Sequence, residues 1–278
     1  NIIFIISLPR AGSTLLQRIL TAHPSIHSTS ESWLLLPQFY ALQSGQVFSE
    51  YSHTSAAGAI NDFCQTLPEG KNTYLKETAN LAIRLFQEST PSGKKYYLEK
   101  TPRNTLIVND LIEAFPNSKF VFLWRQPLAC AASLIETSGK GHWNLYKHSV
   151  DLYDGLINMT KAIASNPEKI IPIQYEKLLS SPEQTIIKLL NKLDLDDNSL
   201  LLEQFKDVTF GGRMGDPTGI KMYSSLSKEP LEKWKSTFNT PTRHYWASRY
   251  LKWLGPERLS VMGYDYASLE AELDSIKL

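Results

Sequence analysis

Cysteine is scarce in this sequence, which has only Cys64 and Cys130 among its 278 residues. Two cysteines do not make a disulfide framework, and they fit a reducing compartment. Apolar runs stay far short of the ~20 residues that a membrane span needs, and no signal peptide is visible. We therefore expect a cytoplasmic protein. Because Asn1 stands inside an apolar run without an initiator methionine, we expect the natural chain to extend beyond it, where any leader or anchor would lie.

An excess of one charge is also absent, because 29 Lys and Arg residues balance 28 Asp and Glu residues and leave a net charge of +1. Nucleic-acid-binding domains show a basic footprint, so we expect no nucleic acid partner, and any anion site must be local. Metal-ligand spacing is missing as well, because neither cysteine belongs to a zinc pattern. We expect no metal site from the histidines either (His23, His27, His142 and His148).

The remaining composition, 42% apolar and 21% charged, is that of a globular protein with a sizeable core. Short runs rich in Ile, Val and Phe predict buried strands at residues 2–6, 96–98, 120–123 and 170–173. Helical patterns lie between them, at 14–22, 34–42, 56–63, 105–114, 128–135, 145–164 and 182–193. This alternation predicts a single α/β domain over residues 1–278, with a central parallel sheet and helices on both faces in three P-loop-like layers. A helical insert covers about 33–90, and a C-terminal lid and tail cover about 211–278.

Basic side chains follow three of the four predicted strands. Arg10 comes after the first strand, Lys100 after the second and Arg125 after the third, while Tyr175 follows the fourth. Ligands of parallel α/β sheets bind beyond the carboxyl ends of the strands. We therefore expect the three cations to converge on an anion, together with the N–H groups of the first helix.

The first strand, turn and helix read FIISLPRAGSTLLQRIL, residues 4–20. The phosphate loop of nucleoside triphosphatases is G-x-x-x-x-G-K-[ST], but here Ser7 replaces the first glycine and Ser13 replaces the lysine. Only Gly12 and Thr14 match. The missing lysine is the group that reaches the terminal phosphates, and we see no strand-ending acid that would hold Mg²⁺. The loop therefore suits a single 5′-phosphate held by backbone N–H groups without metal.

The segment SLPRAGSTLL resembles the 5′-phosphosulfate loop of sulfotransferases that use 3′-phosphoadenosine 5′-phosphosulfate (PAPS). The segment FVFLWRQPLACAASL, residues 120–134, resembles the motif with which the same family grips the 3′-phosphate. The resemblance implies PAPS as co-substrate, with no metal required. It also implies a set of nucleotide-binding residues: Arg10, Ala11, Gly12, Ser13, Thr14 and Leu15 around the 5′-phosphosulfate, Arg125 and Ser133 at the 3′-phosphate, Tyr175 of IQYEKLL at the nucleotide, and Lys233 of PLEKW reaching the 3′-phosphate.

The catalytic residues also follow from this resemblance. Cytosolic sulfotransferases place a histidine two residues after the strand-end lysine, but Pro102 stands there after Lys100. Tyrosylprotein and related bacterial sulfotransferases use a glutamate instead, and in AHPSIHSTSESW that glutamate falls on Glu31, in a region that reads as a loop over the strand tips. Lys100 matches the lysine that stabilises the leaving group, and Arg10 matches a ligand of the sulfuryl oxygens.

Local chemistry offers alternatives for the catalytic pair. Glu31 could instead belong to the first turn of the helix that begins near Trp33, stabilised by its dipole. Lys100 could instead be a surface lysine paired with Glu99. A serine of the C-terminal loop assists in relatives, and the loop at 211–227 is also the expected lid. The residue that supplies the assisting hydroxyl stays open among Thr218, Ser224, Ser225 and Ser227.

The resemblance implies transfer of a sulfuryl group from PAPS to a hydroxyl acceptor. The neutral charge balance does not favour a cleft for acidic tyrosine peptides, so a carbohydrate or small metabolite is the preferred acceptor. A peptide tyrosine and a carrier-bound acyl group are the alternative acceptors. Outside this class, the alternatives are a P-loop kinase or nucleoside triphosphatase and a non-catalytic nucleotide-binding module.

Overall fold

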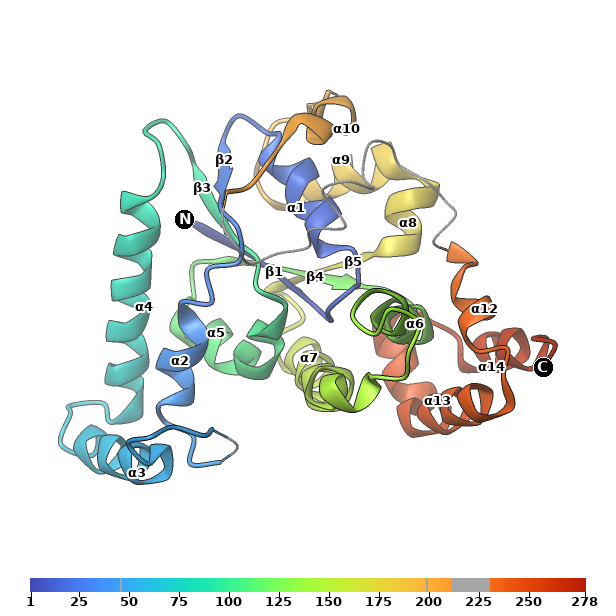
Figure 1. Cartoon of the computed structure of the whole chain (residues 1–278). Coiled ribbons are helices and arrows are strands. Elements are labelled where there is room, and N and C mark those ends of the chain that lie inside the picture. The colour runs from blue at the N-terminus through green and yellow to red at the C-terminus, as the bar shows by residue number, and fades with distance from the viewer. Residues whose placement is uncertain (46, 199, 212–230) are drawn as a thin grey trace.

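The computed structural model describes residues 1–45, 47–198, 200–211 and 231–278. Its centre is one parallel five-stranded sheet with the strand order β2-β3-β1-β4-β5 (Figure 1). The strands are β1 (Ile2–Ser7), β2 (Ile26–Ser28), β3 (Tyr96–Glu99), β4 (Lys119–Trp124) and β5 (Ile170–Gln174). Four of them confirm the predicted strands, and β2 was not predicted.

The centre of the sheet is β1, whose six residues are all buried. It pairs with β3 through Phe4 and Glu99, and with β4 through Ser7 and Leu123. All four pairings in the sheet are parallel, so the carboxyl ends of the strands lie on one edge. This edge carries every segment that the sequence analysis assigned to ligand binding before residue 180.

Side chains alternate between the two faces of the sheet, and each face has its own hydrophobic core. Ile3 and Ile5 point to one core, while Phe4 and Ile6 point to the other. The first core is covered by α1 (Ser13–Thr21), α8 (Tyr175–Ser180), α9 (Pro182–Lys192), α10 (Leu201–Gln204) and η4 (Phe205–Asp207). The three layers of the predicted α/β fold are therefore confirmed, as Figure 1 shows.

Most of the helices in the described part of the chain belong to the second core. They are α2 (Leu35–Tyr40), α4 (Lys71–Glu88), the 3₁₀ turn η1 (Pro102–Ile107), α5 (Val108–Ala114), α6 (Pro127–Thr137), the 3₁₀ turn η2 (Leu145–His148), the π-helical turn η3 (Val150–Gly155), α7 (Leu156–Ser165), α12 (Trp234–Thr237), α13 (Pro241–Met262) and α14 (Tyr266–Asp274). The insert adds α3 (His53–Cys64), which packs on α4. No helix in the described ranges is long and apolar enough to cross a membrane.

Three local predictions need correction. Residues 27 and 28 are not part of a loop, because they pair with β3 as the edge strand β2. The predicted helix at 145–164 is divided into η2, η3 and α7, and the one at 105–114 begins as the 3₁₀ turn η1. The described part of the C-terminal tail packs into the second core, while the residues predicted as a lid, apart from Gly211, lie outside the described ranges.

Candidate active site

The turn between β1 and α1 has a backbone that only a few residue types adopt easily. Gly12 has φ of 93°, and Arg10 has φ of 68°. A Cβ atom added to Gly12 would lie 2.4 Å from two ring carbons of Tyr175, so a side chain does not fit there. In the described structure no side chain caps the start of α1. Its first backbone N–H groups can therefore serve an anion, as at other helix N-termini that begin after a tight turn.

Tyr175 and Arg125 contact this turn and hold its backbone in place. The Tyr175 ring is 1% exposed, and the Arg125 guanidinium lies 4.6 Å from its centroid. Arg125 also donates a hydrogen bond of 2.8 Å from Nη1 to the carbonyl of Arg10. The predicted 3′-phosphate residue and the predicted 5′-phosphosulfate loop are therefore neighbours, and the tyrosine fills the space that glycine leaves.

Ser133 lies in the same group, because it accepts a hydrogen bond of 3.2 Å from Nε of Arg10. It comes from the second turn of α6, the helix that follows Arg125. Residues from the ends of β1, β4 and β5 and from α6 thus meet at one edge of the sheet. The remaining predicted loop residues, Ala11, Ser13, Thr14 and Leu15, are buried at the start of α1.

Two predictions concern the C-terminal part of the chain. Lys233 is exposed immediately before α12, whose Thr237 donates a hydrogen bond of 3.2 Å to Glu136 of α6. The lysine therefore precedes a helix that is attached to α6, but its contact with the nucleotide stays a prediction. The four alternatives for the assisting hydroxyl, Thr218, Ser224, Ser225 and Ser227, lie outside the described residues.

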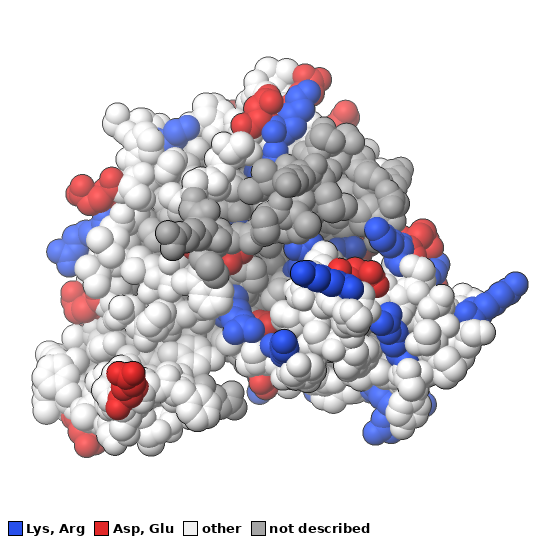
Figure 2. Space-filling model, in the orientation of Figure 1, with Lys and Arg blue, Asp and Glu red and all other residues white. Residues whose placement is uncertain are grey.

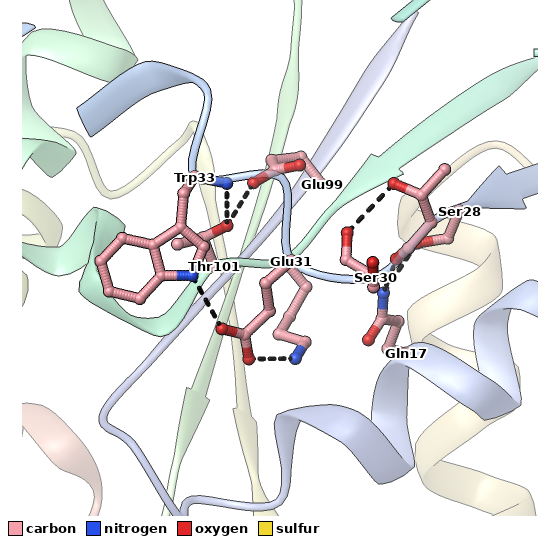
Figure 3. A network of polar contacts seen from close by, with 9 residues as sticks. Gln17, Ser28, Ser30, Glu31, Trp33, Glu99 and Thr101 are labelled. Carbon is pink, nitrogen blue, oxygen red and sulfur yellow. Dashed lines mark hydrogen bonds and ion pairs between the residues drawn. The ribbon is translucent and has the colours of Figure 1, made fainter. Parts of the chain in front are cut away.

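Glu31 and Lys100 form an ion pair of 2.8 Å between Oε1 and Nζ (Figure 3). Only 11% of the glutamate side chain and 2% of the lysine side chain are exposed. Lys100 is therefore not a surface lysine paired with Glu99. Glu31 lies four residues before the start of α2 at Leu35, so it is not in the first turn of that helix either. The geometry excludes both alternatives that local chemistry had left open for this pair.

A further donor holds the second oxygen of the same carboxylate. The indole Nε1 of Trp33 donates a hydrogen bond of 3.2 Å to Oε2 of Glu31. Trp33 itself has φ of 52°, a left-handed backbone that a bulky residue rarely adopts. Such a conformation costs about 1–3 kcal/mol and persists only where neighbouring groups hold it.

The neighbouring groups are Glu99 at the end of β3 and two hydroxyls that bond to it. Glu99 is 2% exposed and accepts hydrogen bonds from Thr101 Oγ1 at 2.7 Å and from Ser32 Oγ at 3.0 Å. The same Thr101 hydroxyl accepts a hydrogen bond of 3.4 Å from the backbone N–H of Trp33. Burial raises the pKa of Glu99 above 4.5, against the opposing effect of the two hydroxyls and of the Lys100 charge.

The opposite end of this loop is fixed by α1. Gln17 Nε2 donates hydrogen bonds of 2.8 Å to Ser28 Oγ and to the carbonyl of Thr29, and Ser28 Oγ in turn donates to the carbonyl of Leu98 at 2.7 Å. Figure 3 shows this second contact region on the other side of Glu31. The sequence analysis missed the roles of Gln17, Ser32, Trp33, Glu99 and Thr101. Its statement that no acid ends a strand needs correction, because Glu99 is the last residue of the buried strand β3, where its carboxyl group accepts from two hydroxyls.

Comparisons with known proteins give the family of the chain. A family model described as "Sulfotransferase family" matches residues 2–199. A Caenorhabditis briggsae protein, provisionally named a protein-tyrosine sulfotransferase, is 25% identical over 274 residues, which is 96% of this chain and 90% of that protein. The protein-tyrosine sulfotransferase of Drosophila melanogaster is 24% identical, and the match spans 95% of this chain but only 52% of the fly protein.

Solved structures share the fold. A sulfotransferase domain from the curacin biosynthetic pathway superposes with a TM-score of 0.56 at 22% identity, covering 90% of this chain and 96% of that domain. A mouse sulfotransferase in complex with PAP superposes with a TM-score of 0.52 at 13% identity, covering 94% of this chain and 85% of that one. These likenesses concern the fold, while the family match carries the assignment. The chain belongs to the sulfotransferase family, which confirms its resemblance to the PAPS-dependent sulfotransferases.

Proposed function

We propose that this enzyme transfers the sulfuryl group of PAPS to a hydroxyl acceptor, with Glu31 as the general base. The observation that carries the proposal is the Glu31–Lys100 pair, which is largely buried at the sheet edge that also holds the phosphate loop. A nucleotide-binding module needs neither a positioned carboxylate nor a buried lysine. In-line sulfuryl transfer needs both, one for the acceptor proton and one for the charge on the leaving group.

The residues at the sheet edge fit the two ends of PAPS. Gly12 lets the Tyr175 ring pack against the turn, and no side chain of the described residues caps the start of α1. The backbone N–H groups of residues 12–15 therefore suit a 5′-phosphosulfate, whereas the N–H of Ala11 already donates to the carbonyl of Leu8 at 3.2 Å. Arg10 adds a cation for the sulfuryl oxygens. Arg125 and Ser133 are the groups for the 3′-phosphate, with Lys233 as a third donor. Tyr175 supports the loop and contacts the nucleotide from its buried position.

The proposed step moves one proton and one sulfuryl group. Glu31 takes the proton of the acceptor hydroxyl while the acceptor oxygen forms its bond to sulfur. The bond between sulfur and the bridging phosphate oxygen breaks, and PAP leaves with that oxygen and its electron pair. Lys100 has three N–H donors, of which one bonds Glu31, so another can bond the bridging oxygen as negative charge develops on it. We propose that the step requires no metal.

We propose a carbohydrate or small-metabolite hydroxyl as the acceptor. The support for this acceptor is the overall charge balance, because a net charge of +1 gives little long-range attraction to a strongly acidic peptide. On the face drawn in Figure 2, the Lys and Arg side chains of the described residues are more frequent on the right half, with Asp and Glu side chains among them. The second candidate is a peptide tyrosine, which is favoured by the names of the nematode and fly relatives. A carrier-bound acyl hydroxyl is a third acceptor to test.

Two measurements test donor and acceptor separately. In a thermal-shift assay, PAP without Mg²⁺ should raise the melting temperature, whereas ATP with Mg²⁺ should not; the reverse would contradict the PAPS assignment. Incubation with ³⁵S-labelled PAPS should then label acceptors from a panel of saccharides, small alcohols, carrier-bound hydroxyacyl groups and acidic tyrosine peptides. Labelling of tyrosine peptides alone would replace the preferred acceptor by the second candidate.

The role of Glu31 has its own test. The Glu31→Gln variant keeps the shape of the side chain but cannot take a proton, so kcat should fall by about 10²- to 10⁴-fold. PAP affinity should stay unchanged, because the assigned phosphate ligands are other residues. Calorimetry with PAP and initial rates with the best acceptor measure the two effects. A Gln variant with normal turnover would refute the mechanism and leave the nucleotide site intact.

A further inference from the structure

The carboxylate of Glu31 is held at both oxygens by different donors. Oε1 accepts from Lys100 Nζ at 2.8 Å, and Oε2 accepts from the Trp33 indole at 3.2 Å (Figure 3). The terminal torsion of a glutamate has a broad, roughly two-fold preference, so the side chain alone does not fix the direction of its lone pairs. Two donors from different segments fix it, and the lysine cannot do so by itself.

We propose that Trp33 is a positioning residue for the base, which holds Glu31 by its indole N–H, and that Glu99 holds Trp33 through Thr101 and Ser32. This inference rests on the proposed function of Glu31. Nothing in the indole ring's packing requires the N–H group. Trp33 lies half-buried against the second core, a position that a phenylalanine ring would also fill. The N–H matters only if the orientation of the Glu31 carboxylate matters.

The support from β3 explains how the tryptophan stays in place. The backbone N–H of Trp33 donates to Thr101 Oγ1 at 3.4 Å, and the backbone N–H of Leu34 donates to Ser32 Oγ at 3.3 Å. Both hydroxyls donate to the single buried carboxyl group of Glu99, at 2.7 Å and 3.0 Å. Through these two hydroxyls, the Glu99 side chain fixes the backbone N–H groups of Trp33 and Leu34, next to the left-handed φ of 52° at Trp33.

This arrangement also links the base to the leaving-group lysine. Glu99 and Lys100 are consecutive, so the strand end that positions Lys100 also anchors the loop that carries Glu31. A shift of the loop relative to the strand would change the distance from the base to the lysine. Positioning errors of about 1 Å can cost about 10²-fold in rate. We therefore expect the network to affect turnover more than nucleotide binding.

The first test is Trp33→Phe, which keeps an aromatic ring and removes the N–H donor. We expect kcat to fall about 10- to 100-fold, the worth of a hydrogen bond to a charged group, with PAP affinity and melting temperature close to those of the wild type. The matched control is Trp253→Phe in α13, a half-buried tryptophan packed on Tyr153 and Tyr250, which should keep wild-type turnover.

A double-variant comparison separates positioning from a general structural effect. If Trp33 acts through the base, Trp33→Phe should cause no further loss of turnover in the Glu31→Gln background. A loss of the same size in both backgrounds would overturn the inference. The second pair of variants does not touch the indole: Thr101→Val should lower kcat, and Thr101→Ser, which keeps the hydroxyl, should restore most of it. Equal activity of the valine and serine variants would overturn the role of Glu99.

The outcomes also distinguish this inference from the proposed function. If Glu31→Gln is fully active, or if labelled PAPS transfers to no acceptor, the proposed function fails. If Glu31→Gln is inactive and Trp33→Phe is as active as Trp253→Phe, only the positioning role fails.

Discussion

Two carboxyl groups lie close to Lys100, and their burial gives them different properties. Glu31 keeps 11% of its side chain exposed and shares an ion pair with the lysine. Glu99 is 2% exposed and its carboxyl group accepts from two neutral hydroxyls. A buried carboxylate without a strong cation partner is disfavoured by desolvation, so the pKa of Glu99 is raised. The two carboxyl groups therefore differ in their partners, a buried lysine for Glu31 and two hydroxyls for Glu99.

The raised pKa of Glu99 predicts how stability changes with pH. The folded state binds the proton of the Glu99 carboxyl group more tightly than the unfolded state does. The stabilisation that this proton gives is therefore complete below pH 4.5, the ordinary pKa of the group. It is lost as the pH rises through the raised native pKa. The free energy of unfolding of the wild type, relative to the Glu99→Gln variant, should therefore decrease as the pH rises above about 4.5. Urea denaturation of both proteins between pH 4 and 9 measures this, and a difference that increases with pH would contradict the prediction.

At the scale of the element, the turn between β1 and α1 depends on the absence of a side chain at Gly12. The Gly12→Ala variant would combine a positive φ of 93° with a methyl group 2.4 Å from the Tyr175 ring. The left-handed backbone costs about 1–2 kcal/mol, and overpacking costs about 1–3 kcal/mol. We expect a loss of about 2–5 kcal/mol in the free energy of unfolding and at least about tenfold weaker PAP binding, because the turn would move.

The control for this prediction is Gly58→Ala in α3. A Cβ there has no other atom within 4 Å, and the glycine is inside a helix. Alanine in such a position stabilises by about 0.5–1 kcal/mol. Chemical denaturation and calorimetry with PAP compare the two variants. A Gly12→Ala protein as stable as Gly58→Ala would show that the turn does not need glycine.

The elements that the sequence predicted well are those with a strong local pattern. The four longer strands follow from apolar runs, whereas β2 has three residues, two of them polar, His27 and Ser28. It is a strand only because Ile26 pairs with Tyr96 of β3, which lies 70 positions away in the sequence. In α13 the chain is kinked at Gly255, whose φ of 67° is not helical, and Pro256 follows it, so the element consists of two helical segments that meet at this point.

The same distinction holds for the site. Glu31 and Lys100 were assigned from their resemblance to family motifs, and the folded chain joins them in an ion pair. The positions of Trp33 and Thr101 depend on hydrogen bonds between segments that are 68 residues apart. No pattern within either segment indicates that the indole faces the carboxylate. Contacts of this kind require the folded chain, because each segment alone is compatible with a simple loop.

At the scale of the whole molecule, the C-terminal helices hold the strand ends together. Gln174, at the end of β5, donates a hydrogen bond of 2.8 Å to the carbonyl of Gly263. Tyr264 donates one of 2.7 Å to Glu176, which also accepts from the backbone N–H of Gln126 at 2.9 Å. The tail after α13 therefore fixes the segment that follows Arg125 to the one that follows β5. The described part of the tail thus supports the strand ends by these hydrogen bonds, while its helices pack into the second core.

An ion pair connects the segment after Lys100 to the second helical layer, and it gives the last prediction. Arg103 donates two hydrogen bonds to the carboxylate of Asp151 in η3, one of 3.1 Å from Nε to Oδ1 and one of 3.2 Å from Nη2 to Oδ2. The aspartate side chain is 1% exposed and the arginine side chain 36%. Breaking a buried pair from one side costs about 3–5 kcal/mol, because the remaining charge is left in the interior. Since Arg103 is partly exposed, we expect Arg103→Met to cost about 1–3 kcal/mol.

The exposed pair Lys119–Asp194 is the control, although its distance of 2.7 Å is shorter. Its aspartate side chain is 67% exposed, so water replaces the lost lysine and Lys119→Met should change stability far less. Adding Asp151→Asn to Arg103→Met should recover part of the loss, because the buried charge is then gone. Urea denaturation of the four proteins, including the wild type, measures these differences. Equal losses for the two single variants would mean that distance, and not burial, determines what an ion pair contributes here.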